Sequence, residues 1–477
     1  MRNSRDHLIR GAGALLLLSA LIGCANPQEQ LQGDGLIVLE GGTLIDGTEA
    51  APKLNSVVVL QGERIVRVGT VGQFAYPPNA KVINLTARWV VPGFIDTHAH
   101  MPDPVDQAEV LRTLLAFGIT SIRSPAADPS SGVELRDRLA RGEILGPRLR
   151  TAGRLIDAPG GWFSGWAAEV TSEKEVRTEV RRQAAEGVNF IKLYRGLAPE
   201  LVEAAIDEAH DLGLRVIGHL ANTTWGQAAS SGIDGLAHFG RYATPWELAP
   251  EPHRAAIRRA CEQCKIVGDE EGFQILRSKV LTDGPEAAEW ARLLAGRRVT
   301  IEPNLVLLHA VFWGDDTGVL EALEPAYAPA SWRDGKSFNA VPHPYRTSCT
   351  AEWVREAQAT YPFFEQLVSL LKRNGVVLTV GTDLMNPWMT PGVSYHREME
   401  LLVGAGLTPE EVLAAATKNG AIALGLEGEV GTIQQGMAAD LVVLKSNPAA
   451  DIRNTRAIES VFLRGRKVDP SGLLGQR

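Results

Sequence analysis

The chain has 477 residues, of which 45% are hydrophobic and 22% charged, and it contains only four cysteines. This composition is that of a globular protein, and it excludes a disordered chain, a collagen-like fibre and a small disulfide-stapled domain. The formal net charge is −8, and no long basic run follows the N-terminus, so nothing favours a nucleic-acid partner. The length allows several domains, or one large α/β barrel with additions.

The N-terminus has the pattern of an export signal. Three arginines precede an apolar stretch at 14–22, which is too short to span a bilayer and is typical of a signal peptide. This stretch runs into Leu-Ile-Gly-Cys24, which resembles the lipobox of bacterial lipoproteins, where the cysteine is lipidated and becomes the new N-terminus. A plain secretory signal with an incidental cysteine is the alternative. We predict a signal peptide over 1–23, a polar tether over 24–35, and a lipid anchor that holds the protein in the periplasm or cell envelope.

Two other cysteines, Cys261 and Cys264, are three residues apart in a helical pattern, so they share a helix face. A zinc site built on this pair would need a second pair, which the sequence lacks. Buried free thiols are the favoured interpretation, and a local disulfide in an oxidising compartment is the alternative.

Both ends of the mature chain are rich in β patterns. Residues 36–91 contain four apolar runs separated by glycine-rich turns, and residues 433–470 have the same character. Because the two ends of a domain often lie close together, these segments could pair in one sheet. We predict a composite β-sandwich domain formed from both segments.

The middle of the chain, residues 92–432, alternates short apolar runs with amphipathic helical patterns, which is typical of βαβ units. The candidate strands are 94–98, 119–123, 148–153, 190–194, 215–219, 235–238, 299–305 and 376–380. Eight β/α units favour a closed (β/α)8 TIM barrel, in the α/β class, over an open sheet. The long connections at 240–298 and 306–375 are predicted to be helical insertions that roof the site.

Histidines and a carboxylate follow several of these strands. His98 and His100 end the first strand, where alternate residues point the same way and both rings can face one ion. His219 ends the fifth strand, His238 ends the sixth, and Asp383 follows the eighth. Any single histidine is more often a packing or loop residue. In a barrel, however, these strand ends converge on one face, where four imidazoles and a carboxylate suit Zn²⁺.

Lys192 lies between apolar residues at the end of the fourth strand. An unpaired buried ammonium is costly, so such a lysine is usually paired with a carboxylate or neutral. A buried salt bridge is one interpretation. The other is that the neutral amine has captured CO₂, giving a carbamate whose oxygens can bridge two cations.

Taken together, these motifs resemble the amidohydrolase superfamily, in its imidazolonepropionase-like branch, which also contains metal-dependent prolidases. The matching stretches are 42–47 (Gly-Thr-Leu-Ile-Asp-Gly), 91–100 (Val-Pro-Gly-Phe-Ile-Asp-Thr-His-Ala-His), 146–148 (Gly-Pro-Arg), 190–192 (Phe-Ile-Lys), 218–219 (Gly-His), 237–238 (Ala-His), 381–383 (Gly-Thr-Asp) and 436–442 (Gly-Met-Ala-Ala-Asp-Leu-Val). The resemblance runs over nearly the whole mature chain. It implies a (β/α)8 barrel with a composite β-sandwich.

The resemblance also implies a site with two divalent metal ions, with zinc the default in the family. The more buried metal would be held by His98, His100 and Asp383, the more exposed metal by His219 and His238, and both by the carbamate of Lys192. A hydroxide between the metals would be the nucleophile, and the exposed metal would polarise the scissile carbonyl. Asp383 would take the proton of the nucleophile and pass it to the leaving nitrogen.

Tryptophans distinguish this chain from relatives, which often have Gly-Gly-His after the third strand. Here residues 160–166 read Gly-Gly-Trp-Phe-Ser-Gly-Trp. Trp162, Trp166, Trp225 and Trp388 all fall in expected loops on the active face. Each alone is more often a packing residue, but together they suggest an aromatic wall around the substrate.

Three further residues are candidate substrate contacts. Arg195 and Tyr242 could grip a substrate carboxylate, because arginine is suited to bidentate contact with such a group. A surface position is the alternative for Arg195. His396 opens a helix after the eighth strand, and we predict that it lines the pocket.

The sequence therefore predicts an exported, lipid-anchored, binuclear metal-dependent amidohydrolase that acts on a small molecule with an amide-type C–N bond, such as a dipeptide or N-acyl amino acid. A cyclic amide, a lactone or a phosphotriester is an alternative substrate, because the same nucleophile can attack each of these. A non-catalytic binding lipoprotein with the same fold is the rival from another class. The presence of all six ligand positions favours the enzyme.

Overall fold

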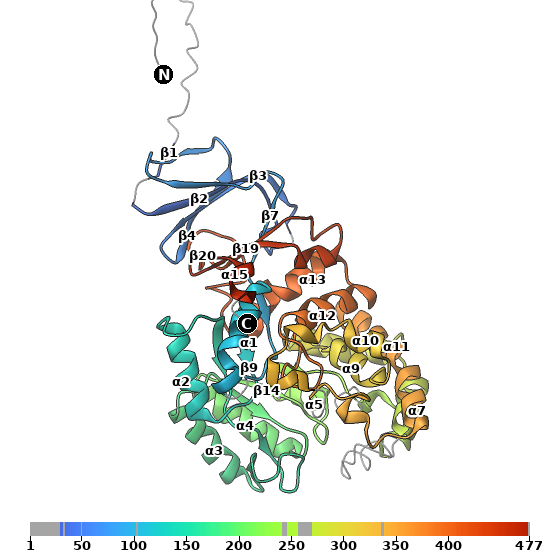
Figure 1. Ribbon diagram of the computed structural model, residues 1–477. Coiled ribbons are helices and arrows are strands. Elements are labelled where there is room, and N and C mark those ends of the chain that lie inside the picture. The colour runs from blue at the N-terminus through green and yellow to red at the C-terminus, as the bar shows by residue number, and fades with distance from the viewer. Residues whose placement is uncertain are drawn as a thin grey trace, which may run out of the picture.

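The computed structural model describes residues 29–31, 34–48, 50–101, 104–240, 246–255, 270–334 and 338–475. The predictions for Cys24, Tyr242, Cys261 and Cys264 lie outside these ranges. Within them, no helix combines the length and the apolar character that crossing a membrane requires. A β-sheet part lies on top of a larger α/β part in Figure 1.

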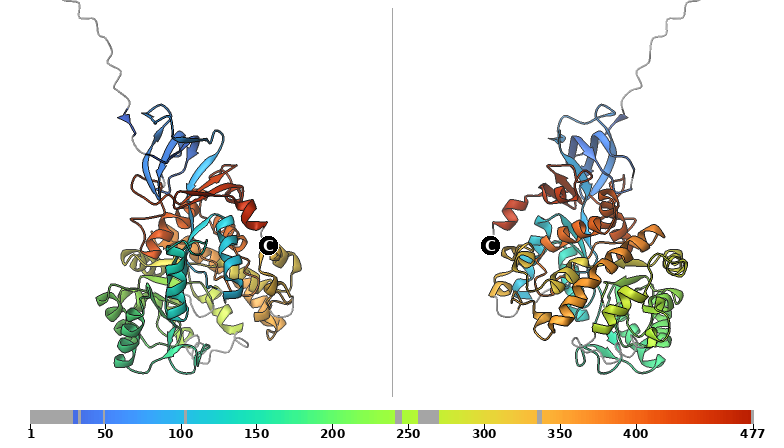
Figure 2. Two further views of the ribbon diagram at one scale, coloured as in Figure 1. Left: turned by 60° about the vertical axis from the view of Figure 1, so that its left-hand side comes forward. Right: turned by 90° about the vertical axis from the view of Figure 1, so that its right-hand side faces the viewer.

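The upper part is an eight-stranded sheet built from both ends of the chain, as the blue and red strands of Figures 1 and 2 show. Its strands run in the order β20 (Arg466–Val468), β19 (Ile458–Leu463), β18 (Leu441–Leu444), β7 (Trp89–Pro92), β2 (Leu36–Leu44), β3 (Lys53–Gln61) and β4 (Arg64–Thr70), with β6 (Lys81–Asn84) beside β2. The two ends of the chain meet where β18 pairs antiparallel with β7. A short parallel pair, β1 (Glu29–Gln30) and β5 (Phe74–Ala75), lies outside this sheet.

Strand β3 shows why this sheet has two apolar faces. Val58 and Leu60 belong to one buried cluster, and Val57 and Val59 belong to another. Successive side chains of a strand point to opposite faces, so an uninterrupted run of valines covers both. A strand in which polar and apolar residues alternate would instead have one face of the sheet in contact with water.

The α/β part contains parallel strands in two sheets. One sheet has the order β10 (Arg148–Thr151), β9 (Ile119–Ser124) and β8 (Phe94–Asp96). The other has the order β12 (Ala168–Glu169), β11 (Ile156–Asp157), β13 (Phe190–Leu193), β14 (Arg215–Gly218), β15 (Gly235–Ala237), β16 (Thr300–Glu302) and β17 (Val377–Leu378). Each of the eight predicted strand segments overlaps one of these strands, and β11 and β12 are two short strands that were not predicted.

Parallel bridges join the three-stranded sheet to the other sheet on both of its sides. Ala152 pairs with Phe190 on one side, and Ala99 pairs with Leu384 on the other. The second seam also has a hydrogen bond of 3.0 Å from the Thr97 amide to the Val380 carbonyl. The strands therefore follow one another in a TIM-barrel-like arrangement.

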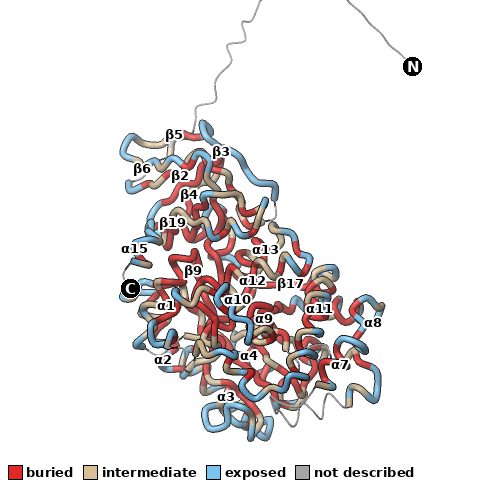
Figure 3. The backbone as a smooth tube through the Cα atoms, turned by 45° about the vertical axis from the view of Figure 1, so that its right-hand side comes forward, coloured by how far each residue is buried: buried red, intermediate tan, exposed pale blue. Residues whose placement is uncertain are grey.

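Helices follow most of these strands and pack their apolar faces on them. They are α1 (Pro104–Ala116), α2 (Pro129–Ala140), α3 (Glu173–Ala185), α4 (Pro199–Asp211), α5 (Trp225–Ser230), α8 (Pro285–Gly296), α11 (Ala351–Arg373), α12 (Val393–Gly404), α13 (Pro409–Ala416), α14 (Lys418–Leu424) and, at the C-terminus, α15 (Pro470–Leu474). Polar N-caps define several starts, and Thr224 and Thr408 both form capping boxes. Figure 3 shows the buried backbone inside and the exposed backbone on outer surfaces such as α3 and α8.

The two long connections are helical, but their helices mostly pack to one side. The first connection contains η1 (Trp246–Leu248), α7 (Glu270–Lys279) and α8. The second contains α9 (Leu305–Phe312), α10 (Thr317–Glu321), η2 (Pro325–Tyr327), η3 (Ala330–Asp334), η4 (Pro344–Arg346) and α11. A further short helix, η5 (Ile452–Arg456), belongs to the C-terminal segment. Helix α11 packs against α7, α8 and α9. The part around η4 reaches the loop after Asp383, where His343 Nε2 lies 3.1 Å from the Pro387 carbonyl oxygen.

Candidate active site

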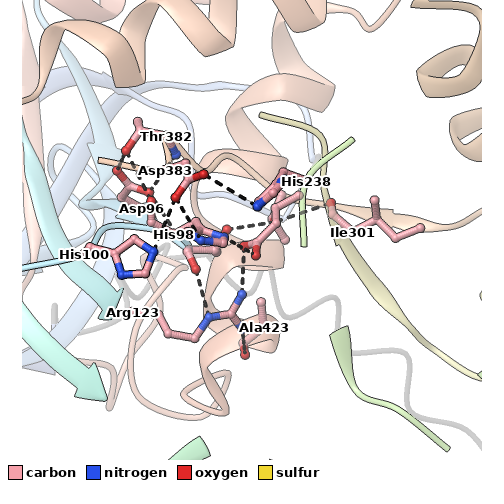
Figure 4. A network of polar contacts seen from close by, with 12 residues as sticks. Asp96, His98, His100, Arg123, His238, Ile301, Thr382, Asp383 and Ala423 are labelled. Atoms are coloured by element: carbon pink, nitrogen blue, oxygen red, sulfur yellow. Dashed lines mark hydrogen bonds and ion pairs between the residues drawn. The ribbon is translucent and has the colours of Figure 1, made fainter. Parts of the chain in front are cut away.

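The predicted metal-binding residues meet at the carboxyl ends of the parallel strands, and Asp96 in β8 joins two of their segments. One Asp96 oxygen accepts hydrogen bonds from the backbone amides of His98 (3.0 Å) and Thr382 (3.2 Å). The other accepts from the Thr382 hydroxyl at 2.7 Å. The Asp383 amide then donates to the His98 carbonyl at 2.8 Å. These bonds hold Asp383 against the His98 segment (Figure 4).

Asp383 lies at the centre of a cluster of imidazoles. Its Oδ1 is 3.2 Å from His98 Nε2 and 3.4 Å from His100 Nε2, and its Oδ2 is 3.6 Å from His238 Nε2. The ligand atoms of His98, His238 and Asp383 all lie within 4.8 Å of one another, which is close enough for one metal ion. Figure 4 shows the three histidines pointing toward this carboxylate.

His219 and Lys192 lie on the neighbouring strands of the same site. The His219 ring centre is 4.3 Å from that of His238. Lys192 in β13 pairs in register with Ile217 in β14, two residues before His219. The Lys192 amine is buried and has no hydrogen-bond partner among the described residues. The six residues predicted as ligands therefore lie at the same end of the parallel strands.

Burial sets the protonation of most of these groups. It lowers the pKa of His238 to about 4, that of His219 well below its ordinary value, and that of Lys192 to about 8. Neutral imidazoles keep a lone pair for a metal ion. Burial alone would raise the pKa of Asp383, but the nearby His98, His100 and His238 hold it well below its usual range.

Glu302 and Arg123 are parts of the site that the sequence analysis missed. Glu302 Oε1 lies 2.7 Å from His98 Nδ1, and its Oε2 accepts from Arg123 Nη2 at 2.8 Å. Arg123 Nε also donates to the Thr97 carbonyl at 2.8 Å. A carboxylate on Nδ1 leaves Nε2 of His98 as the metal-binding nitrogen. The available signal was a glutamate inside an apolar predicted strand, because a buried charge needs a partner.

Asn304 and Asn386 support the Asp383 backbone from two sides. With its amide oriented to satisfy both neighbours, Asn304 donates to the Glu302 carbonyl at 3.1 Å and accepts from the Asp383 amide at 3.0 Å. Asn386 Nδ2 donates to the Asp383 carbonyl at 2.8 Å, and its oxygen accepts from the Tyr345 hydroxyl. Asp383 itself has a φ of 55°, a backbone conformation that such surroundings must hold in place.

The predicted substrate contacts are only partly brought to the site. Arg195 is 4% exposed, so the surface alternative for this residue is wrong, and its guanidinium carbon lies 3.9 Å from the Trp162 ring centre. Trp162 and Trp166 are exposed in the loop after β11.

Two of the four tryptophans predicted for the aromatic wall are core residues instead. Trp225, the first residue of α5, is buried and stacks on Phe239 and Trp290. The Trp388 indole is buried and donates to the Ala340 carbonyl at 3.0 Å. The prediction of a wall made by all four is therefore wrong.

His396 also lies in the core, so the prediction that it lines the pocket is wrong. It is 1% exposed, its Nδ1 lies 2.8 Å from the Thr455 hydroxyl, and its Nε2 lies 3.0 Å from the Phe117 carbonyl oxygen. Its ring packs against Phe94 and Phe117. Both nitrogens are thus engaged in linking α12 to α1 and the C-terminal segment, and neither is available to a substrate.

The amidohydrolase family model matches residues 89–251 and 361–468, which is more than half of the chain. The chain therefore belongs to the amidohydrolase family, and it is a hydrolase of that family. A relative is the imidazolonepropionase of Symbiobacterium thermophilum, with 24% identity over 99% of both chains.

Solved structures with the same fold include a Xaa-Pro dipeptidase with bound methionine in the active site. That structure has a TM-score of 0.64 and 19% identity, and the match covers 91% of this chain and 100% of that one. Another is a bottromycin amidohydrolase, with a TM-score of 0.68, 21% identity, and coverage of 91% of this chain and 87% of that one.

Proposed function

We propose that the protein is a binuclear metal-dependent hydrolase that cleaves an amide-type C–N bond in a dipeptide or N-acyl amino acid. The observation that carries the proposal is the buried Asp383 carboxylate among the Nε2 atoms of His98, His100 and His238. The proposal includes a closed eight-stranded barrel, supported by the bridges at both sheet edges. That geometry brings the ends of non-adjacent strands to one face.

The donor set fits two divalent cations, and zinc is the first choice. His98, His100 and Asp383 would hold one ion, His219 and His238 the other, and a carbamate on Lys192 both. Neutral imidazoles with a carboxylate are a common zinc ligand set. The buried, unpartnered Lys192 amine fits a carbamate better than a salt bridge, because no carboxylate lies within ion-pair distance of it in the described structure. When bound, such ions would acidify a water and polarise the scissile carbonyl.

The protein's own groups then have separate tasks. Asp383 accepts a proton from the attacking water through a carboxylate oxygen and delivers it to the leaving nitrogen. Glu302 holds His98 in one tautomer, and Asn304 and Asn386 hold the Asp383 backbone. These contacts limit the motion of the proton carrier, as an efficient transfer requires.

The substrate class is proposed from the relatives together with Arg195. A Xaa-Pro dipeptidase of the same fold has methionine bound in its active site, which supports a substrate with a free carboxylate. Burial, His238 and Arg195 all act to lower the pKa of His219, so the Arg195 charge is close enough to be felt at the site. The second candidate is a cyclic amide, because the imidazolonepropionase relative matches over 99% of the chain.

A direct test is a hydrolysis screen of zinc-loaded protein against dipeptides, N-acyl amino acids, cyclic amides and lactones, with Asp383→Asn as the matched control. We expect turnover of a linear amide, and a loss of about 10²- to 10⁴-fold in kcat for Asp383→Asn. Turnover of lactones or cyclic amides alone would contradict the substrate proposal. A near-normal rate in Asp383→Asn with full metal content would show that another group carries the proton.

We also propose that the protein is exported and held at the cell envelope by lipid on Cys24. The support is the sequence pattern at residues 14–24. Fractionation of cells that express wild type and Cys24→Ala tests this proposal. The wild type should be in the membrane fraction and the variant in the soluble periplasm. Soluble wild-type protein in the cytoplasm would contradict it.

A further inference from the structure

The loop between β11 and β12 carries three exposed aromatic side chains within five residues. Trp162 is 45% exposed, Phe163 is 46% exposed and Trp166 is 39% exposed. Single exposed apolar residues are ordinary on a protein surface, but a contiguous group of large ones usually marks a contact site. The adjacent glycines leave the loop little apolar surface other than these rings.

The aromatic loop is continuous with the candidate active site. The Phe163 ring meets the Tyr194 ring edge-on, with centres 5.6 Å apart, and the Tyr194 ring meets His219 at 4.8 Å. Trp166 extends the series outward, with its ring centre 6.3 Å from that of Phe163. An unbroken series of rings therefore leads from a proposed metal ligand to the protein surface.

A cation lies at the edge of the same surface. The Arg195 guanidinium stacks on the Trp162 ring at 3.9 Å, and it is almost fully buried there. Such stacking fixes the plane of the guanidinium. A molecule that combines a ring with a carboxylate matches these neighbouring features better than a purely apolar molecule does.

We propose that Trp162, Phe163 and Trp166 form an aromatic shelf that binds a large apolar group of the substrate, preferably an aromatic ring, next to Tyr194, which lies between the shelf and His219. This inference rests on the proposed function and narrows its substrate class to amides with an aromatic or bulky apolar group next to the scissile bond. Offset or edge-on contact with the shelf removes both partners from water. The contact of the shelf with Tyr194, whose ring meets His219, favours a substrate over a membrane or protein partner.

The test compares amide substrates that differ only in one side chain: alanine, leucine, phenylalanine or tryptophan on either side of the scissile amide. Wild-type protein should have the highest kcat/KM for an aromatic substrate. The double variant Phe163→Ala/Trp166→Ala should lose about 10-fold or more of that preference, mainly through KM, because kcat/KM falls far more for aromatic substrates than for alanine substrates. The control is Leu145→Ala. Leu145 is 46% exposed, like Phe163, but it precedes β10 and so lies at the amino end of the strands, away from the aromatic loop.

Calorimetric binding of molecules without an amide separates this inference from the proposed function. L-Phenylalanine and 3-phenylpropionate should bind the wild type at least 10-fold more tightly than L-alanine and propionate, and the double variant should lose this difference. That result would stand even if no amide were hydrolysed, which would refute only the proposed function. Hydrolysis without aromatic preference, or preference retained by the double variant, would overturn the shelf. A double variant that instead loses binding to anionic lipid vesicles, with unchanged substrate preference, would overturn it as well.

Discussion

Each oxygen of Asp383 faces at least one imidazole, and the whole arrangement depends on groups behind it. His98 is held at Nδ1 by Glu302, which is itself held by Arg123. Arg123 and His98 keep the pKa of Glu302 at about 2 although burial would raise it. Glu302 is therefore ionised at neutral pH and forms a buried ion pair with Arg123. Without its partner, either residue would leave an uncompensated charge in the core.

Substitution of this pair separates stability from metal binding. Glu302→Gln leaves the buried Arg123 guanidinium without an opposite charge, so the free energy of unfolding should fall by about 3–5 kcal/mol. The double variant Glu302→Gln/Arg123→Met removes both charges and should recover most of that loss. Zinc affinity should stay about 10- to 100-fold weaker in both variants, because His98 has lost its carboxylate.

Urea unfolding and zinc titration measure the two effects. Full recovery of zinc affinity in the double variant would contradict an orienting role for Glu302. It would mean that the carboxylate serves only to neutralise Arg123.

At the scale of elements, α12 supports the start of α9, close to the site. Asn304 is the N-cap of α9 but makes no capping hydrogen bond, because its side chain lies between Glu302 and Asp383. Glu398 in α12 takes over this task and accepts from the Val306 amide at 2.7 Å. Glu398 of α12 thus caps α9 in place of Asn304, and the Asn304 side chain can support the Asp383 backbone instead.

Replacement of Glu398 tests this division of tasks. Glu398→Leu leaves buried amides of α9 unsatisfied and should reduce the free energy of unfolding by about 1–3 kcal/mol. Glu398→Gln keeps an acceptor oxygen and should stay closer to the wild type. Burial raises the pKa of Glu398 to about 8, so a neutral replacement removes little charge at pH 7.

Chemical denaturation of both variants provides the measurement, with Glu400→Gln on the same helix as the control. The control should change stability by no more than about 0.5 kcal/mol, since Glu400 forms a partly exposed ion pair with Arg397 on the same helix. Equal losses in Glu398→Gln and Glu398→Leu would refute the capping role.

Over the whole molecule, the sequence predicts strands and strand-end residues well and long-range contacts poorly. The βαβ pattern places His98, His219 and His238 on one face, because parallel strands end together. Nothing local indicates that Glu302 would meet His98, since their contact depends on the order of strands around the sheet.

The wrong predictions for His396 and Trp225 have the same cause: each residue lies in the first turn of a helix, and its sequence position does not show whether its side chain faces the core or the site. Trp225 follows Thr224, and the Thr-x-x-Gln pattern there could have predicted a helix start with an inward-facing tryptophan.

Because several buried histidines are neutral in the folded protein, we expect the fold to lose stability in acid. Burial lowers the pKa of His396 to about 3 and that of His309 to about 4, both below the value near 6.5 of an unfolded chain. The unfolded state therefore binds more protons below pH 6.5, and stability is lost as the pH falls from about 6.5 toward 4. Each such histidine contributes at most about 1.4 kcal/mol per pH unit.

Denaturation curves at several pH values between 4 and 7 test this expectation. His309→Phe, which keeps a ring stacked on Trp313, should have a shallower decline of stability than the wild type. An unchanged slope in this variant would show that His309 titrates normally in the folded protein.

The central claim is a site for two metal ions bridged through Lys192, and metal content tests it most directly. Wild-type protein reconstituted with zinc and bicarbonate should hold two zinc ions per chain by elemental analysis. Lys192→Ala should fold normally by circular dichroism, hold fewer than two ions, and recover metal and activity in part when acetate or propionate fills the space. Wild-type protein that binds no zinc, or a Lys192→Ala variant that keeps two ions and ordinary turnover, would contradict the account.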